Sequence, residues 1–132
     1  MKNSQVVGEF QHMVSELLIR HRSILDCLSK YQESTSRVNR SIIKTVTDCG
    51  CISIIANKQQ FPPTDSLKDC GKHADSHIKG KLCEHCQEII AEEIGNHLFY
   101  LAAICSLLDL KLEDVFNMEY NRLNTLGHYF LS

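Results

Sequence analysis

Two closely spaced pairs of cysteines are the residues of this sequence best suited to chemistry. Cys49 and Cys51 are separated by one glycine, and Cys83 and Cys86 form a Cys-x-x-Cys pair further along the chain. Thiolate is the soft ligand that zinc prefers, and four thiolates complete a tetrahedral shell. A Cys-x-x-Cys pair can reach one ion from a turn or a helix start, while Gly50 permits the tighter bend of a Cys-x-Cys pair. The spacing therefore predicts one structural zinc ion held by Cys49, Cys51, Cys83 and Cys86.

Other metal and thiol chemistry fits the same spacing. An iron–sulfur cluster also takes four thiolates. Cys83 and Cys86 could instead form a redox dithiol, although the βαβ context of thioredoxin-like motifs is missing. His73 and His77 lie four residues apart and could replace one thiolate, and His85 stands between two of the predicted ligands. The spacing leaves these alternatives open.

A second candidate site is a row of acidic side chains just after the Cys-x-x-Cys pair. Glu88, Glu92 and Asn96 recur every four residues and share one face of a helix, and Glu93 is also a helical neighbour of Asn96. Carboxylates in this arrangement can hold Mg²⁺, which prefers oxygen ligands and retains waters for phosphate chemistry. A solvated acidic helix face is the alternative interpretation.

Basic residues recur at helical spacing earlier in the chain. Arg37, Arg40 and Lys44 follow one another at intervals of three and four residues and share one face. They could contact phosphate groups, or they could form ion pairs with Glu88 and Glu92. We expect the ion pairs.

Helices are the elements that must position these residues. Apolar residues at a 3.6-residue period predict four main helices, over residues 5–30, 36–47 and 82–108 and from about Leu112 onward. Residues 34–36, Ser-Thr-Ser, predict the break between the first two. The third helix is the most regular, and Cys27 and Cys105 fall on apolar stripes that predict core positions. The fold class is therefore predicted to be all-α, a small helical bundle.

Residues 57–81 are predicted to form a long connecting loop. They contain two adjacent prolines, two glycines and few apolar residues. Loops of this length are uncommon in compact domains and often functional. The cysteine pairs lie at the predicted end of the second helix and start of the third, so one zinc ion would clamp two helix ends across this loop. The 132 residues are expected to form one domain.

Composition argues against several classes of partner. The net charge is −2, which is no reason to expect nucleic-acid binding. Residues 1–60 have eight basic and five acidic side chains, whereas residues 61–132 have six and eleven. The longest apolar stretch, 94–110, is too short and too polar to span a membrane. With no signal-peptide core after Met1, a cytoplasmic location is expected, where seven cysteines favour metal binding over disulfides.

One stretch of the sequence resembles a known family. Residues 92–101, Glu-Glu-Ile-Gly-Asn-His-Leu-Phe-Tyr-Leu, are followed by Leu-Leu-Asp-Leu-Lys-Leu-Glu-Asp-Val at 107–115. This resembles the MazG-like all-α nucleoside triphosphate pyrophosphohydrolases, whose pattern is Glu-Glu-Leu-Gly-Asp, an apolar helix and a Leu-Gly-Ile-Asp-Leu-Glu-like turn. The match covers roughly residues 88–123. The resemblance implies a nucleotide substrate, Mg²⁺-dependent hydrolysis between the α and β phosphates, and a homodimer or higher homo-oligomer.

The resemblance also implies roles for individual residues. Glu93 matches a metal-binding glutamate of the family pattern, and Asn96 stands where the pattern has an aspartate. Further residues would act as Mg²⁺ ligands or as phosphate contacts: Glu88 and Glu92, and Arg37 and Arg40. No Glu-x-x-Glu motif occurs near residues 37–47, where the family has one, and the cysteine pairs are not part of the family pattern.

The sequence thus predicts a divergent MazG-like protein with a structural zinc site, and it leaves open whether the chain is catalytic. Two alternatives remain. The chain could be a non-catalytic, zinc-stabilised helical interaction protein, or a redox sensor that loses zinc when its thiols are oxidised.

Overall fold

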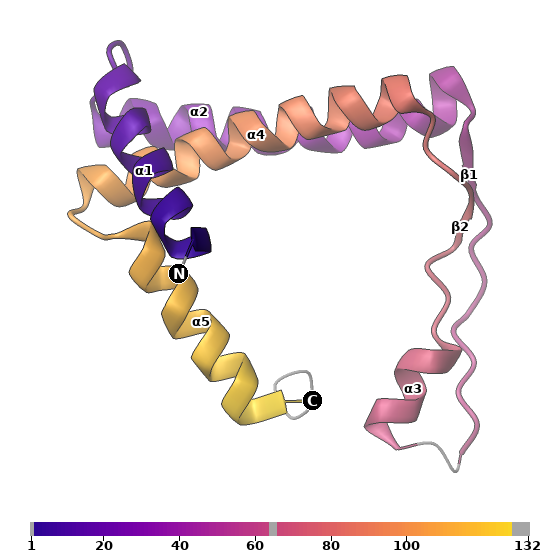
Figure 1. The fold of residues 1–132 in the computed structure, drawn as a ribbon. Helices are drawn as coiled ribbons and strands as arrows, with labels where there is room; N and C mark the ends of the chain where they lie inside the picture. Colours follow the sequence, from indigo (N-terminus) through magenta and orange to yellow (C-terminus); the bar gives the residue numbers. More distant parts are fainter. Residues whose placement is uncertain (1, 64–65, 128–132) are drawn as a thin grey trace.

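The computed structural model is mostly α-helical and elongated, with one small two-stranded sheet (Figure 1). It describes residues 2–63 and 66–127. The elements, in chain order, are α1 (Lys2–Leu17), α2 (Ile24–Lys44), the π-helical turn η1 (Thr45–Cys49), β1 (Ile52–Ile54), α3 (Leu67–His73), β2 (Ile78–Gly80), α4 (Glu84–Leu107) and α5 (Leu112–Leu126). The predicted all-α class is confirmed. No helix in the described part of the chain is long and apolar enough to cross a membrane.

The two longest helices, α2 and α4, lie side by side and form a rod (Figure 1). The residues of α2 that are buried are small: Cys27, Ser34 and Ser41, followed by Thr45 at the start of η1. Intervals of seven and four residues place them on one face of the helix. The buried hydroxyls are satisfied by donating to carbonyl oxygens three residues earlier, at 2.6–2.7 Å. Small side chains at this face allow α2 and α4 to pack closely.

The predicted break at residues 34–36 is wrong, because α2 runs without interruption from Ile24 to Lys44. Ser34 does not cap a helix; it is buried against α4 and bonds a carbonyl of its own helix. The predicted helix over residues 5–30 is also wrong as a single element. α1 ends at Leu17 and α2 begins at Ile24. Leu18 lies in the turn between them but is buried, so the apolar pattern continues across it and hides the boundary.

The hydrophobic core lies at one end of the rod, where α1 and α5 meet α2 and α4. Its buried members are Val14, Leu18, Cys27, Ala102, Ala103, Cys105 and Leu112. The prediction that Cys27 and Cys105 are core residues is confirmed, and burial raises the pKa of both thiols. These two cysteines are therefore unreactive packing residues.

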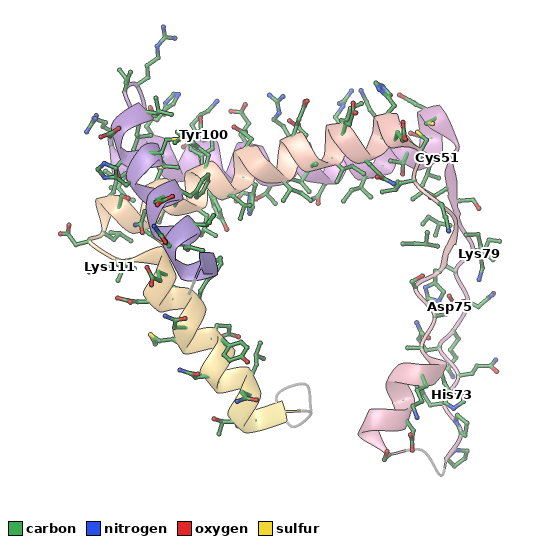
Figure 2. All side chains as sticks on the ribbon, viewed as in Figure 1. Cys51, His73, Asp75, Lys79, Tyr100 and Lys111 are labelled. Atoms are coloured by element: carbon green, nitrogen blue, oxygen red, sulfur yellow. The ribbon has the colours of Figure 1, made fainter. Side chains whose placement is uncertain are left out.

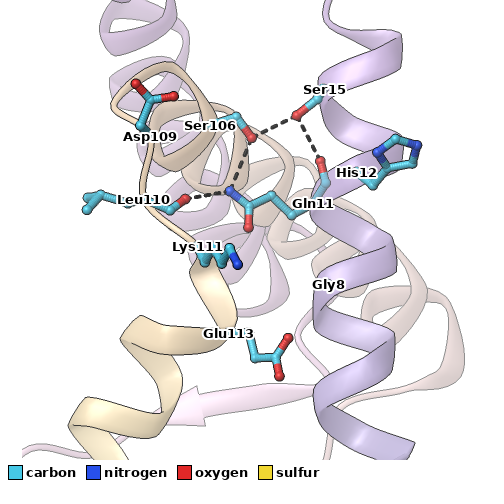
Figure 3. Close-up of a pocket in the computed structure, with 9 residues that line it drawn as sticks. All are labelled: Gly8, Gln11, His12, Ser15, Ser106, Asp109, Leu110, Lys111 and Glu113. Atoms are coloured by element: carbon cyan, nitrogen blue, oxygen red, sulfur yellow. Dashed lines mark hydrogen bonds between the residues drawn. The ribbon is translucent and has the colours of Figure 1, made fainter.

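Gln11 fastens the turn between α4 and α5 to α1 (Figure 3). Its Nε2 donates to Ser106 Oγ at 3.1 Å and to the Leu110 carbonyl oxygen at 2.7 Å, and its Oε1 accepts from the Leu112 backbone N–H at 2.8 Å. Ser15 adds a hydroxyl contact to Ser106 at 2.8 Å. This network joins α1 to the end of α4 and to the first residue of α5.

At the opposite end of the rod, residues 51–81 project as an arm (Figure 1). β1 and β2 pair antiparallel in the arm, with Ile52 opposite Gly80 and Ile54 opposite Ile78. Beyond them, the side chain of Gln59 exchanges two hydrogen bonds with the backbone of Asp75, at 2.7 and 2.9 Å. The arm is thus two chain segments held together along their length.

The predicted loop over residues 57–81 is wrong in part, since it contains α3 and β2; residues 64–65 of this range lie outside the described residues. α3 begins after Ser66, whose Oγ accepts from the Asp69 backbone N–H at 3.3 Å. A cap of this kind stabilises a helix start. A helix of only seven residues has too few apolar positions to show a period in the sequence.

Candidate metal centre

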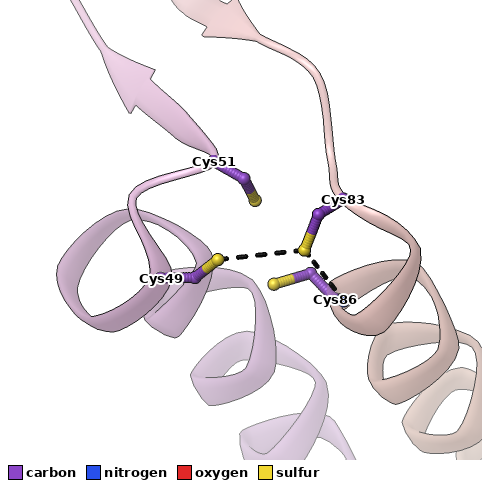
Figure 4. A group of neighbouring side chains, drawn as sticks. All are labelled: Cys49, Cys51, Cys83 and Cys86. Carbon is purple, nitrogen blue, oxygen red and sulfur yellow. Dashed lines mark hydrogen bonds between the residues drawn. The ribbon is translucent and has the colours of Figure 1, made fainter.

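Four cysteine sulfurs converge where the rod meets the arm (Figure 4). The sulfur atoms of Cys49, Cys51, Cys83 and Cys86 all lie within 4.8 Å of one another, and those of Cys49 and Cys83 are 3.8 Å apart. Tetrahedral zinc with Zn–S bonds of about 2.3 Å separates its sulfurs by about 3.8 Å. A disulfide would bring two sulfurs to about 2.0 Å, and these cysteines are free. The cluster therefore has the dimensions of a four-thiolate metal shell.

The first cysteine pair is positioned by the π-helical turn η1. The chain widens from α-helix to π-helix after Lys44, and η1 ends at Cys49, followed by the cap residue Gly50, which has a φ of 77°. The Gly50 N–H donates to the Thr45 carbonyl oxygen at 2.8 Å. Glycine adopts this left-handed conformation without strain. The turn at Gly50 directs both Cys49 and Cys51 toward the start of α4, as Figure 4 shows.

The second pair is positioned by the N-terminus of α4. Cys83 is the N-cap residue, and its sulfur accepts a hydrogen bond from the Cys86 backbone N–H at 3.4 Å. Chiefly because of this bond, the pKa of Cys83 is lowered to about 7. The pKa of Cys86 is raised to about 12, first by its hydrogen bond with the Cys83 sulfur and then by burial. The two thiols of the pair thus have pKa values shifted in opposite directions.

Repulsion between ionised thiolates is the physical reason why this cluster favours binding of a cation. Four thiolates within 4.8 Å of one another repel strongly, so they cannot all ionise in the absence of a compensating charge. A divalent cation removes that repulsion and replaces the protons. Because all four positions of a tetrahedral shell are supplied by protein, the site would have no open position for a substrate. Such a site suits a structural role.

The arm connects the two cysteine pairs through the backbone. β1 follows directly after Cys51, and β2 ends at Gly80, shortly before Cys83. Gly80 has a φ of 92°, and a Cβ atom there would lie 2.7 Å from the Cys51 carbonyl oxygen. Gly80 therefore lets the two ligand segments approach closely. The sequence pattern alone does not predict this role; the one available signal is a glycine three residues before Cys83.

The histidines near the cysteines do not join the cluster. Among the residues that the structure describes, the four cysteines form the only group of three or more His, Cys, Asp or Glu side chains with converging ligand atoms. His73 and His77 lie in the arm, where His77 has a buried Nε2 atom with no hydrogen-bond partner. His85 is exposed and lines a cavity of about 310 Å³ beside Cys49 and Cys86.

The structure turns Glu93 away from the other acidic candidate residues. Glu88, Glu92 and Asn96 are exposed on α4, whereas Glu93 turns toward α2. There its Oε2 accepts a hydrogen bond from Arg37 Nε at 2.9 Å. The carboxylates of Glu88, Glu92 and Glu93 do not converge within a single chain in the described structure.

The expected pairing of the basic face with Glu88 and Glu92 is wrong. Arg37 pairs with Glu93 instead, and the described residues show no ion pair between Arg40 or Lys44 and either predicted acidic partner. The reason is rotational: Glu93 lies on the side of α4 that faces α2, and Glu88 and Glu92 lie around the helix from it. Arg40 lies on the outer surface of α2, beside Asn39 and Ile43.

His97 forms a contact that the sequence did not predict. Its ring stacks on Tyr31 with centroids 4.6 Å apart, and its Nδ1 lies 2.9 Å from Ser34 Oγ. The Ser34 hydroxyl donates to the Tyr31 carbonyl oxygen at 2.6 Å, so Ser34 accepts from a protonated Nδ1. This polar contact fixes the register of α2 against α4.

Comparisons with protein-family models, with curated proteins and with solved structures found no match to this chain. The MazG-like resemblance of residues 88–123 thus stays a prediction from the sequence. The site must be interpreted from its own geometry.

Proposed function

We propose that this chain is a helical scaffold whose arm end is held together by one structural zinc ion bound to Cys49, Cys51, Cys83 and Cys86. The observation that carries the proposal is the convergence of four sulfurs within 4.8 Å, at the spacing of a tetrahedral thiolate shell. A cluster of two or more irons would hold some of its cysteine sulfurs farther apart, because the ligands are divided among the metals. A redox dithiol would need only two of these four cysteines.

The distribution of buried residues supports a structural role for the metal. The hydrophobic core lies at the α1 and α5 end of the rod. Near the cysteines the buried residues are few: Ser41, Thr45, Ile52 and Cys86. Ends of chain segments without a sizeable core are commonly held by a metal or a disulfide. Zinc would join η1, β1 and the start of α4, where few apolar side chains are buried.

Metal analysis tests this proposal directly. Protein purified without chelators should contain one zinc ion per chain and no stoichiometric iron, as measured by inductively coupled plasma mass spectrometry. Removing the metal with a strong chelator should make four additional thiols reactive under native conditions. Metal-free protein, or protein with iron in place of zinc, would contradict the proposal.

The resemblance to MazG-like proteins supports a second candidate, a divergent Mg²⁺-dependent nucleotide pyrophosphohydrolase. Glu93 and Asn96 would be its catalytic residues, with Glu88 and Glu92 as Mg²⁺ ligands. We favour the non-catalytic scaffold, because Glu93 is paired with Arg37 and the other carboxylates point into solvent. A tight Mg²⁺ site needs its oxygen ligands to meet around one ion.

An assay with nucleoside triphosphates distinguishes the two candidates. With Mg²⁺ present, we expect the chain to release no more pyrophosphate than a Glu93→Ala variant does, for each of the common nucleoside triphosphates. The variant controls for contaminating activity and for release without catalysis. Release that depends on both Mg²⁺ and Glu93 would establish the enzyme and rule out the purely structural scaffold.

A further inference from the structure

The chain has a much larger solvent-accessible surface than is typical of a folded monomer of its mass. Its solvent-accessible surface is 10183 Å² for 15.0 kDa. A folded monomer of this mass exposes about 7,000 Å², so the excess is roughly 3,000 Å². Obligate homodimers bury about 2,000–5,000 Å² in total from both partners. The excess is therefore large enough to supply one chain's share of such an interface.

A mostly apolar stripe on α2 is partly exposed. The stripe residues follow one another at alternating intervals of four and three: Ile24, Leu28, Tyr31, Thr35, Val38 and Ile42. This is the heptad spacing of helices that pack against another helix pair. At 3.6 residues per turn, the stripe lies roughly a quarter turn away from the buried residues that face α4. Packing against α4 therefore covers the stripe only in part: Tyr31 stacks on His97 of α4, whereas Leu28 is 46% exposed and Ile42 is 43% exposed.

α4 has a matching stripe of Ile90, Ile94, Leu98 and Leu101, of which Ile94 and Leu98 are exposed. Because α2 and α4 are antiparallel, these stripes lie on the same side of the rod and together form what we call the apolar face. Figure 2 shows mostly carbon on the side of the rod between the arm and α5, while nitrogen and oxygen tips gather on the opposite side. Two helices with adjoining apolar stripes are half of a four-helix bundle.

The arm and α5 project from opposite ends of the rod on the side of this apolar face (Figures 1 and 2). Their charges are complementary, because residues 51–81 contain five lysines and three aspartates, whereas residues 109–127 contain four acidic and two basic residues. Both segments also expose large apolar side chains, among them Ile54 and Ile78 in the arm and Phe116 and Leu123 in α5. Antiparallel pairing would place the arm of each chain beside α5 of the other.

We infer that a second copy of this chain covers the apolar face, with the two rods antiparallel, so that four helices form a bundle and each arm lies against α5 of the partner. Parallel pairing would place arm beside arm and α5 beside α5, where net charges of equal sign repel. The apolar face is built by helices alone. The inference therefore goes beyond the zinc proposal and does not require the metal to be zinc.

Substitution of neighbouring isoleucines tests the apolar face. Ile42 lies in the α2 stripe, whereas Ile43 lies on the outer surface of the same helix and is more exposed, at 57%. The full chain should sediment as a dimer. Ile42→Glu should weaken dimerisation by roughly 100-fold or more because it buries an unpaired charge, while Ile43→Glu should leave the dimer intact. A monomeric wild-type chain at 100 µM or so, or equal effects of both substitutions, would overturn the inference.

A folding control keeps this test decisive. Circular dichroism should show the same helix content for both glutamate variants. If Ile42→Glu loses helix, the milder pair Ile42→Ser and Ile43→Ser replaces it and is judged by the same sedimentation criterion. Zinc content measured on the same samples separates failure at the apolar face from failure at the cysteines.

Cross-linking between isotopically mixed chains tests the antiparallel arrangement. Dimers formed from ¹⁴N-labelled and ¹⁵N-labelled protein are treated with a carbodiimide, which joins lysines to carboxylates in contact. We expect links that pair arm lysines of one label with α5 carboxylates of the other label. Links between chains that join only arm to arm would overturn the antiparallel arrangement.

Discussion

Cys86→Ser should release the metal and disorder the arm end of the rod while leaving the hydrophobic core folded. Cys86 lies in the first turn of α4, and only 7% of its surface is exposed. Serine is a poor zinc ligand, and structural zinc sites contribute about 10–16 kcal/mol of binding energy. We expect zinc affinity to fall by on the order of 1,000-fold or more, and Tm to drop by about 10 °C.

The effect of Cys86→Ser should be local, because the core and the cysteines lie at opposite ends of the rod. Hydrogen exchange measured by mass spectrometry should show lost protection in residues 45–55 and 78–90. Protection should persist in residues 99–112, which pack in the core. Local loss of this kind is the expected behaviour of a region with few buried apolar contacts.

Cys70→Ser is the matched control for this experiment. Cys70 is a free cysteine in α3 and is not part of the sulfur cluster. This variant should retain one zinc ion per chain and wild-type protection near the cysteines. Should Cys86→Ser keep its zinc, or should both variants lose it equally, the assignment of the metal to this cluster fails.

Gly80→Ala should be the second most damaging substitution, although it removes no ligand. The φ of 92° at Gly80 strains any other residue, and the added Cβ would meet the Cys51 carbonyl oxygen at 2.7 Å. The obstructing atom belongs to the backbone, so no side-chain rotation relieves the contact. We expect the free energy of unfolding to fall by about 3 kcal/mol.

The same substitution should weaken zinc binding, because relief of the clash requires β2 to move away from Cys51. A competitive chelator titration should show an affinity on the order of 10-fold lower, as is typical of residues that orient metal ligands. Gly71→Ala is the control: a Cβ at Gly71 in α3 meets nothing within 4 Å, and its φ is not in the left-handed region. Unchanged zinc affinity in Gly80→Ala would show that the arm does not hold the ligand segments.

The helices were predicted well where the apolar period is long and regular. The third predicted helix, 82–108, corresponds closely to α4, Glu84–Leu107, and the predicted start of the last helix at Leu112 is the start of α5. The predicted helix over residues 5–30 was wrong because the apolar period continues through the turn between α1 and α2. The predicted start at residue 36 was wrong because the polar residues 34–36 do not interrupt α2. The chain instead turns at residues 18–23, where Leu18 is buried and maintains the apolar pattern.

The strands of the arm and their pairing could not be predicted from the local sequence pattern. Its strands have three residues each, and their pairing joins segments far apart in the sequence. A β-pair of that length has almost no periodic signal, since its stability comes from cross-strand contacts. The role of Gly80 follows only from that pairing, because the carbonyl that it accommodates belongs to Cys51.

By itself, the sequence determined which side chains could bind a metal and that helices would bring them together. Thiolate chemistry and short ligand spacings are properties of residue type and of local backbone, so Cys49, Cys51, Cys83 and Cys86 could be identified without a fold. Only the tertiary structure decided which acidic side chain of α4 forms an ion pair and which are exposed to solvent. Which of Glu88, Glu92 and Glu93 faces α2 depends on how α4 is rotated against α2, and that rotation is set by packing between distant segments. It directs Glu93 to Arg37, leaves the other two carboxylates in solvent, and exposes the apolar face.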